Sequence, residues 1–177
     1  RYGTLLPVEA VLKKLYYTSV SKALSLLPRQ DRKLVGEVLA VSVDIENCFT
    51  SVASLLYGYS PPLVREMLIR GLGKISSTVF LRVVDASSTS EVLELLAPYR
   101  DVVEAILEGR EEVAYVRSRR MIRDLLLSRS VERTMDLSYA LMYMELFEDE
   151  WRDLCFVTYA VGYNIPREDA VNCLICA

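Results

Sequence analysis

The chain has 177 residues, of which 52% are apolar and 25% charged, and its net charge is −3 at neutral pH. This composition excludes a disordered chain, and the acidic balance argues against a dedicated nucleic-acid binder. Histidine is absent, which removes the commonest general base and the commonest metal ligand. Only 7 Gly and 6 Pro interrupt the chain, so we expect long helices and an all-α fold. No apolar run reaches the ~18 residues that span a bilayer, no secretory signal is visible, and a start at Arg1 indicates a fragment or processed form.

Two helices are predicted in the first third of the chain. Helical spacing of Val8, Leu12 and Leu15 predicts the first over residues 5–27, with Pro28 ending it. Asp31 is the expected N-cap of the second, which runs to about Tyr57.

The second helix carries two parallel stripes. One is apolar and heptad-like: Leu34, Val38, Val41, Ile45, Cys48, Val52 and Leu55. The other is small and polar and includes Asp44, Asn47 and Ser51. The polar stripe has two interpretations. Its side chains bond a neighbouring helix or loop backbone, which is the usual role of buried polar groups, or they line a cavity for a partner.

Shorter elements follow. Gly58 is expected to end the long helix in a left-handed cap, and Ser60-Pro61-Pro62 begins a short helix. Residues 75–84 fit a strand by propensity, but we favour a helix capped by Ser76 or Ser77, since no partner strand is evident. Another helix is predicted over 91–96.

A second long helix is predicted from Asp101 to about Ser128. It contains a basic cluster: Arg117, Arg119, Arg120, Arg123 and Arg129. A solvated basic face is one interpretation, and a docking face for an acidic partner or anionic headgroups is the other.

The last long helix is predicted from about Val131 to Val161. Its apolar residues again step by four and three: Ala140, Met144, Phe147, Trp151, Leu154, Thr158 and Val161. Carboxylates cluster in its middle, around Glu148, and would repel one another unless basic side chains pair with them. We expect the arginines of the preceding helix to form these pairs, because consecutive helices pack antiparallel. Pro166 begins a terminal helix.

One helical segment occurs twice. A shift of 104 positions places Glu46 on Glu150, Gly58 on Gly162, Tyr59 on Tyr163 and Pro62 on Pro166. Such self-similarity is typical of stacked helical units, which present surfaces to other proteins. We therefore predict two repeat units, over residues 1–98 and 99–177. The two Gly-Tyr corners are read as helix caps, with a partner contact through the tyrosines as the alternative.

Enzymatic interpretations have little support. Cys173 and Cys176 have the spacing of a thiol oxidoreductase, but the pair closes a short helix instead of opening one after a strand. The carboxylates around Glu148 suggest a di-metal carboxylate site, but helical bundles with such sites usually also contain Glu-x-x-His motifs. There is no glycine-rich phosphate loop, and a Ser-His-Asp triad is impossible without histidine. No cofactor or metal is expected.

The order and spacing of these motifs resemble the C subunit of V/A-type rotary ATPases, which is named the d subunit in vacuolar ATPases. Asp44-x-x-Asn47 matches an Asp-x-x-Asn element of that family, and residues 71–81 look like its glycine-rich turn. Residues 91–99 look like the following helix, and residues 145–150 resemble a Lys-Glu-x-Glu run of the last unit. The chain departs from the family in lacking the Arg-x-Lys before each glycine stop, and only two of the family's three units are present.

The resemblance implies a funnel-like helical subunit on the cytoplasmic face of the membrane, peripheral to it. Its partners would be the central-stalk subunits and the membrane rotor ring, and it would couple ATP synthesis or hydrolysis to ion transport, including hydrogen ion transport, without being an enzyme itself. A generic helical-repeat adaptor outside the ATPase is the alternative. Candidate partner-binding residues are Asp44, Asn47, Ser51, Tyr59, Arg117, Arg120, Glu148 and Tyr163.

Overall fold

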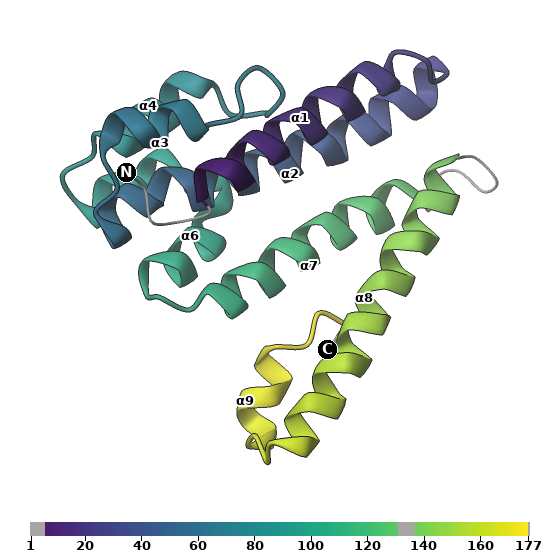
Figure 1. The fold of residues 1–177 in the computed structure, drawn as a ribbon. Helices are drawn as coiled ribbons and strands as arrows, with labels where there is room; N and C mark the ends of the chain where they lie inside the picture. The colour runs from purple at the N-terminus through teal and green to yellow at the C-terminus, as the bar shows by residue number, and fades with distance from the viewer. Residues whose placement is uncertain (1–5, 131–136, 177) are drawn as a thin grey trace. The chain divides into compact units, whose positions relative to one another are not determined.

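Helices are the only regular elements among the described residues. A computed structural model describes residues 6–130 and 137–176, and Figure 1 shows their course. The elements are α1 Leu6–Leu24, α2 Arg29–Tyr57, α3 Pro61–Met67, α4 Ser77–Val84, α5 Thr89–Leu95, the 3₁₀ turn η1 Ala97–Tyr99, α6 Arg100–Leu107, α7 Glu111–Ser130, α8 Leu137–Gly162 and α9 Arg167–Asn172. The all-α prediction is confirmed, and residues 77–84 form a helix and not a strand.

Serine caps begin two of the short helices, and the one at Ser76 was predicted. The Ser76 hydroxyl accepts a hydrogen bond from the Thr78 amide, and the Ser88 hydroxyl accepts one from the Glu91 amide. The predicted cap at Asp31 is wrong, because α2 starts earlier. Pro28 occupies the N-cap and its carbonyl accepts the first helical bond, from the Arg32 amide at 2.9 Å. Asp31 lies in the first turn of α2, where its negative charge interacts favourably with the helix dipole.

The predicted long helix over 101–128 is also wrong, since the chain forms α6 and α7 instead. Gly109 separates them with a φ of 72°. Glycine adopts this left-handed conformation readily, because it has no Cβ. The interruption lets α6 end and pack against α2.

The two Gly-Tyr corners differ in backbone conformation. Gly58 ends α2 in the left-handed conformation, with a φ of 66°, as predicted. The same prediction for Gly162 is wrong, because α8 continues through it and Asn164 takes the left-handed conformation, with a φ of 53°. The Ile165 amide then bonds the Ala160 carbonyl at 2.9 Å and the Asn164 amide bonds Val161 at 3.3 Å, which is a Schellman cap. The predicted start of α8, at residues 131–136, lies outside the described residues.

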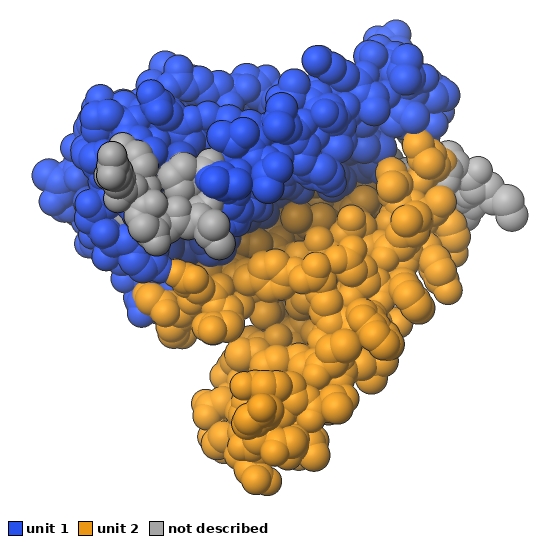
Figure 2. All heavy atoms as spheres, viewed as in Figure 1, with its two compact units in different colours: residues 1–108 blue, residues 109–177 orange. Residues whose placement is uncertain are grey.

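The chain divides into two compact units, residues 1–108 and 109–177 (Figure 2). The division falls after Glu108, whereas the sequence placed it after residue 98. In unit 1, α2 contacts α1, α3, α4 and α6, so it is the central helix of that unit. In unit 2, α7 packs against α8. Repeat symmetry and a funnel-like outline stay predictions.

The middle of helix α2 is buried, because residues of both stripes there face neighbouring elements, whereas Leu55 near its end is 40% exposed. Val43, Cys48 and Val52 are fully buried. By length and composition α2 is apolar enough to cross a membrane, with 50% of its most apolar window buried. The core helix of a globular unit meets the same criterion, and α2 packs as one.

Two apolar stripes that established helical periodicity in the sequence are not packed. On α1, the side chains of Val8, Val11, Leu12, Leu15 and Tyr16 are exposed. On α8, the four-three stripe from Met144 to Val161 is exposed as well, and the opposite face, with Met142, Asp149 and Ala160, is buried. Periodicity therefore predicted the helices but not the side that each one buries.

Candidate functional site

In unit 1 a buried carboxylate organises the segment that follows α3. Asp44 on α2 is 0% exposed. Its Oδ2 accepts hydrogen bonds from the amides of Lys74 at 2.9 Å and Ile75 at 3.1 Å, and from the Tyr99 hydroxyl at 2.9 Å. Since charge-assisted bonds are about twice as strong as neutral ones, one side chain joins α2, the 71–75 segment and η1.

Asn47, one turn after Asp44, fastens the same segment at its beginning. Its Nδ2 donates to the Ile69 carbonyl at 2.8 Å, and its Oδ1 accepts from the Ile69 amide at 2.8 Å. The side-chain amide thus satisfies both backbone groups of one buried residue. Ser51, a further turn along, is buried and donates to the Cys48 carbonyl at 3.3 Å.

Gly73 lets the chain approach the carboxylate. A Cβ at this position would lie 2.0 Å from Asp44 Oδ1 and 3.0 Å from Asp44 Cγ. These distances are far inside van der Waals contact, so residue 73 has to be glycine for the bonds to Lys74 and Ile75 to form. We call Asp44, Asn47, Gly73 and Tyr99 the Asp44 cluster.

Burial dominates the electrostatics of the Asp44 cluster. It raises the pKa of Asp44 above the ordinary 3.8, and hydrogen bonds from Ile75, Tyr99 and Lys74 oppose that rise. Burial, followed by the Asp44 charge, raises the pKa of Tyr99, so its hydroxyl stays protonated and donates. The same two causes raise the pKa of the buried Cys48 thiol. The hydrogen bonds to Asp44 hold the segment after α3 and η1 against α2.

Unit 2 contains an ionic cluster between α7 and α8, which we call the Arg119 cluster. Arg119 Nε donates to Asp149 Oδ1 at 2.8 Å, and its Nη2 donates to Glu145 Oε2 at 2.5 Å. The side chain of Asp149 is 1% exposed. Burial raises the pKa of Asp149 and Arg119 opposes the rise; for Arg119, burial alone would lower the pKa, but its bond to Asp149 and the Glu145 charge raise it. The predicted pairing of the α7 arginines with the acidic cluster is confirmed for Arg119.

The segment after α9 is held from both sides. Asp153 on α8 accepts from the amides of Ile175 at 2.8 Å and Cys176 at 2.7 Å. From α7, Arg120 donates to the Leu174 carbonyl at 2.7 Å, and Arg123 donates to the Ile175 carbonyl at 3.0 Å. The role of Asp153 was not predicted from the sequence, in which it is the last residue of the carboxylate cluster around Glu148. The available signal was its place on a long helix that is followed by a short one, as with Asp44.

Three arginines of the basic face of α7, Arg119, Arg120 and Arg123, therefore bind groups within unit 2. Arg117, Arg119, Arg120 and Arg123 are all half-buried, which corrects the interpretation of a fully solvated face. The thiols nearby are free. Burial raises the pKa of both Cys173 and Cys176, which disfavours the nucleophilic thiolate that a thiol oxidoreductase needs.

The remaining predicted residues lie at the unit surfaces. Tyr59 is half-buried, with its ring centroid 6.1 Å from that of Tyr57. Tyr163 is 70% exposed, and its ring centroid is 4.3 Å from that of Tyr159. Glu148 pairs with Arg152 at 2.7 Å on the surface of α8. The structure thus gathers Asp44, Asn47 and Ser51 within unit 1 and distributes the other candidates.

Among the described residues, no group of three or more His, Cys, Asp or Glu side chains could hold a metal ion. The carboxylates around Glu148 point to different partners: Glu145 and Asp149 to Arg119, Glu148 to Arg152, and Asp153 to backbone amides. The described carboxylates of this cluster therefore do not converge on one point. The described side chains are arranged to fix loops and helices.

Comparison with curated proteins and with solved structures found no match. Comparison with protein families matched one family, described as ATP synthase (C/AC39) subunit, over residues 1–172. The match spans both units, including the Asp44 cluster, the Arg119 cluster and both corners. The chain belongs to this family and is a V/A-type ATPase subunit of the C/d type.

Proposed function

We propose that this protein is the non-catalytic coupling subunit of a V/A-type rotary ATPase or ATP synthase. It would sit at the cytoplasmic face of the membrane, peripheral to it, with the central stalk on one side and the membrane rotor ring on the other. Its work would be mechanical, passing torque between ATP chemistry in other subunits and ion movement through the ring.

The family match over residues 1–172 carries the proposal. The interior of each unit supports it. A torque-bearing part must not yield between its contacts, and close-packed interiors have low compressibility. In unit 1 the Asp44 cluster ties the loop after α3 to the central helix, and in unit 2 the Arg119 cluster ties α7 to α8.

The corners are the candidate contact points. Tyr163 is exposed on the turn that ends α8, and Tyr59 lies on the turn that ends α2. Tyrosine is enriched in binding hot spots because its ring offers a large contact area with a polar tip. Asp44, Asn47 and Ser51 would act indirectly, since their side chains are buried within unit 1.

Bridging is the decisive property to test. The full chain is mixed with purified stalk subunits and with detergent-solubilised rotor ring from the same ATPase, and the stalk is captured at low salt. The proposal expects the ring to be captured with the stalk only when this protein is present. Capture of neither component by the protein would refute the proposal and leave the generic helical adaptor.

Variants locate the contact. Tyr163→Ala and Tyr59→Ala are expected to reduce bridging about tenfold each, as truncation of a hot spot does. Leu26→Ala is the matched control, because Leu26 is 85% exposed and lies away from both corners in the sequence. Equal bridging by all three variants would exclude the corners as the contact.

A further inference from the structure

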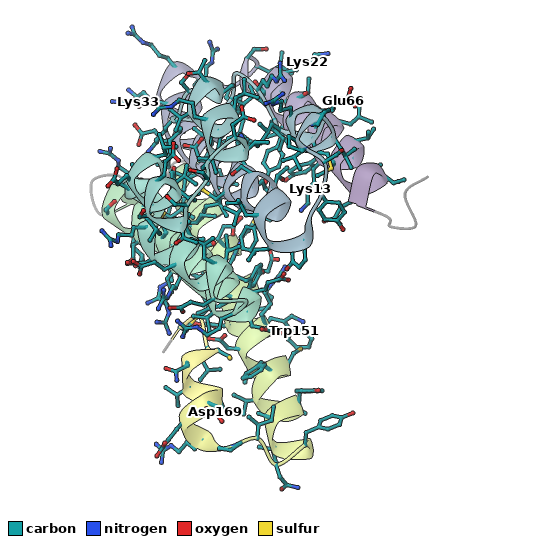
Figure 3. All side chains as sticks on the ribbon, turned by 90° about the vertical axis from the view of Figure 1, so that its left-hand side faces the viewer. Lys13, Lys22, Lys33, Glu66, Trp151 and Asp169 are labelled. Carbon is teal, nitrogen blue, oxygen red and sulfur yellow. The ribbon has the colours of Figure 1, made fainter. Side chains whose placement is uncertain are left out.

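The outer face of α8 is an uncovered heptad seam. Five large apolar side chains on it are each between 60% and 73% exposed: Met144, Phe147, Trp151, Leu154 and Val161. Their spacing follows the alternation of three and four residues that one helix presents to another. At about 1.5 Å per residue, the seam from residue 144 to 161 is about 26 Å long. We call these five residues the α8 seam, and Figure 3 shows the labelled Trp151 extending from the helix.

The α8 seam is rigidly supported from behind. Asp149 and Glu145, on other sides of the same helix, bind Arg119 of α7, and Met142 and Ala160 are buried. The helix therefore buries one apolar face within unit 2 and presents a second. Contiguous exposed apolar surface on a stable element marks an interaction site.

The charges beside the α8 seam select the kind of partner. In the heptad with Met144 and Trp151 at position a, the flanking positions nearest Trp151 hold Glu150 and Glu148, both exposed, and Glu148 pairs with Arg152 of the same helix at 2.7 Å. Flanking positions of a coiled coil choose the partner through charge. Two copies of α8 paired antiparallel about Trp151 would bring Glu150 near its own counterpart, which costs repulsion. An anionic membrane would be repelled in the same way.

We propose that the α8 seam binds an amphipathic helix of another protein, whose apolar heptad face is flanked by lysine or arginine. Trp151 lies near the middle of the seam, where hot-spot residues concentrate. Glu150 contacts the basic flanks and sets the orientation, and Glu148 joins it by exchanging Arg152 for a basic residue of the partner. This inference stands on α8 alone and does not depend on the proposed role in rotor coupling.

The single tryptophan of the chain makes the test direct. The full-length protein is titrated with a synthetic four-heptad peptide that carries Leu at a and d, Lys at e and g, and no aromatic residue. Trp151 emission should shift to shorter wavelength in a saturable way. A peptide with Glu at e and g should bind at least about tenfold more weakly, and a Lys peptide with Ser in place of Leu should give no shift.

Variants of the protein separate the seam from general acidity. Phe147→Ser/Leu154→Ser is expected to weaken binding of the Lys peptide at least about tenfold, with unchanged circular dichroism because both side chains are exposed. Glu148→Lys/Glu150→Lys should reverse the preference between the two peptides. The matched control, Val11→Ser/Leu15→Ser on the exposed stripe of α1, should bind like the parent protein.

Several results would overturn the proposal. One is no shift with any peptide, and another is equal affinity for the Lys and Glu peptides. A third is an emission spectrum of the protein alone that already shows Trp151 as a buried indole. Sedimentation then identifies what covers the α8 seam: the same chain if the protein is a monomer, or a second copy if it is a dimer. A fourth is a shift with phosphatidylcholine or phosphatidylserine vesicles but not with the Lys peptide, which would identify a membrane surface.

Discussion

Replacing Gly73 with alanine tests whether the Asp44 carboxylate fixes the loop after α3. The added Cβ would lie 2.0 Å from Asp44 Oδ1, and the three nearest atoms to it all belong to Asp44. Either the carboxylate or the 71–75 segment must move, and both movements break the bonds to the Lys74 and Ile75 amides. Hydrogen bonds to a charged group contribute about 1.5–3 kcal/mol each, while overpacking costs about 1–3 kcal/mol. We expect Gly73→Ala to lower the free energy of unfolding by at least about 3 kcal/mol, the lower limit for the loss of two such bonds.

A double-mutant cycle identifies the cause. In an Asp44→Ala background no carboxylate meets the new methyl group, so Gly73→Ala should cost no more than about 0.5 kcal/mol. Its effect would therefore be at least about 2.5 kcal/mol smaller than in the parent protein. Gly36→Ala is the matched control, because nothing lies within 4 Å of the place that an added Cβ would occupy on α2, and it should stabilise by about 0.5–1 kcal/mol.

The assay is urea denaturation of the full chain. Circular dichroism follows both units, and the fluorescence of Trp151 follows unit 2 alone, so the transition of unit 1 is the part that only circular dichroism shows. Each transition is fitted separately, because a chain of two compact units does not have to unfold in two states. Equal costs of Gly73→Ala in the two backgrounds would refute the reasoning, since the clash would then not involve Asp44.

Three further predictions test the other parts of the structure. Because burial raises the pKa of Asp44, the folded state holds this proton more tightly than the unfolded one. The stability of the parent protein relative to Asp44→Asn should therefore be highest below about pH 4 and fall as the pH rises through the folded-state pKa of Asp44. Urea denaturation between pH 3 and 7 measures this difference in stability. A difference that rises with pH would contradict a raised pKa for Asp44. Arg119→Leu leaves Asp149 buried without its cation and should lower the free energy of unfolding by about 3–5 kcal/mol, while Arg119→Leu/Asp149→Leu should recover most of the loss. Arg152→Gln, which breaks an exposed ion pair, should cost at most about 1 kcal/mol. Equal costs of Arg119→Leu and Arg152→Gln would show that burial of Asp149 is not the cause. Gly58→Ala should destabilise the protein by about 1–2 kcal/mol because Gly58 has a positive φ. Gly162→Ala, at the last residue of α8, should stabilise it by about 0.5–1 kcal/mol. Thermal unfolding measures both changes in stability, and changes of the same sign would mean that the two corners have the same backbone conformation.

The sequence predicted the existence of the helices better than their ends. Long-range periodicity is a property of many residues and survives local exceptions, so α1, α2 and α8 were expected close to where they are found. Ends depend on single residues. Gly109 was not recognised as a break, and the left-handed position at the end of α8 is Asn164, two residues beyond the glycine that drew attention.

The buried cluster was predicted in part. Asp44 and Asn47 were recognised as a polar pair on an otherwise apolar helix, and their bonding to a loop backbone was one of the two interpretations. Their partners, Ile69, Lys74 and Tyr99, lie between 22 and 55 residues away in the chain. No local pattern specifies such contacts, because they are fixed by how α3, α4 and η1 pack against α2. The same reason explains why Asp153 was missed.

The two units use the same chemistry in different registers. In each, a carboxylate on a long helix accepts hydrogen bonds from two successive amides beyond the following short helix: Asp44 from Lys74 and Ile75, and Asp153 from Ile175 and Cys176. The shift of 104 positions nevertheless places Asp44 opposite Glu148, which binds Arg152 at the surface instead. Geometry accounts for the difference. Asp44 lies 14 residues before the glycine of its corner (58 − 44) and Asp153 lies 9 before (162 − 153), or about 21 Å and 14 Å along the helix at about 1.5 Å per residue.

The returning segments match these distances. In unit 1 the chain runs from Pro61, at the start of α3, to Lys74 before it meets its carboxylate, and in unit 2 it runs only from Arg167, at the start of α9, to Ile175. A longer return reaches farther back along the long helix, so its carboxylate must lie farther from the corner. Under the repeat that the sequence predicts, the unit with the shorter return would keep its anchor only at a position closer to the corner. Under this reasoning the equivalent of Asp44 in unit 2 is Asp153, which an alignment by residue identity alone would not select.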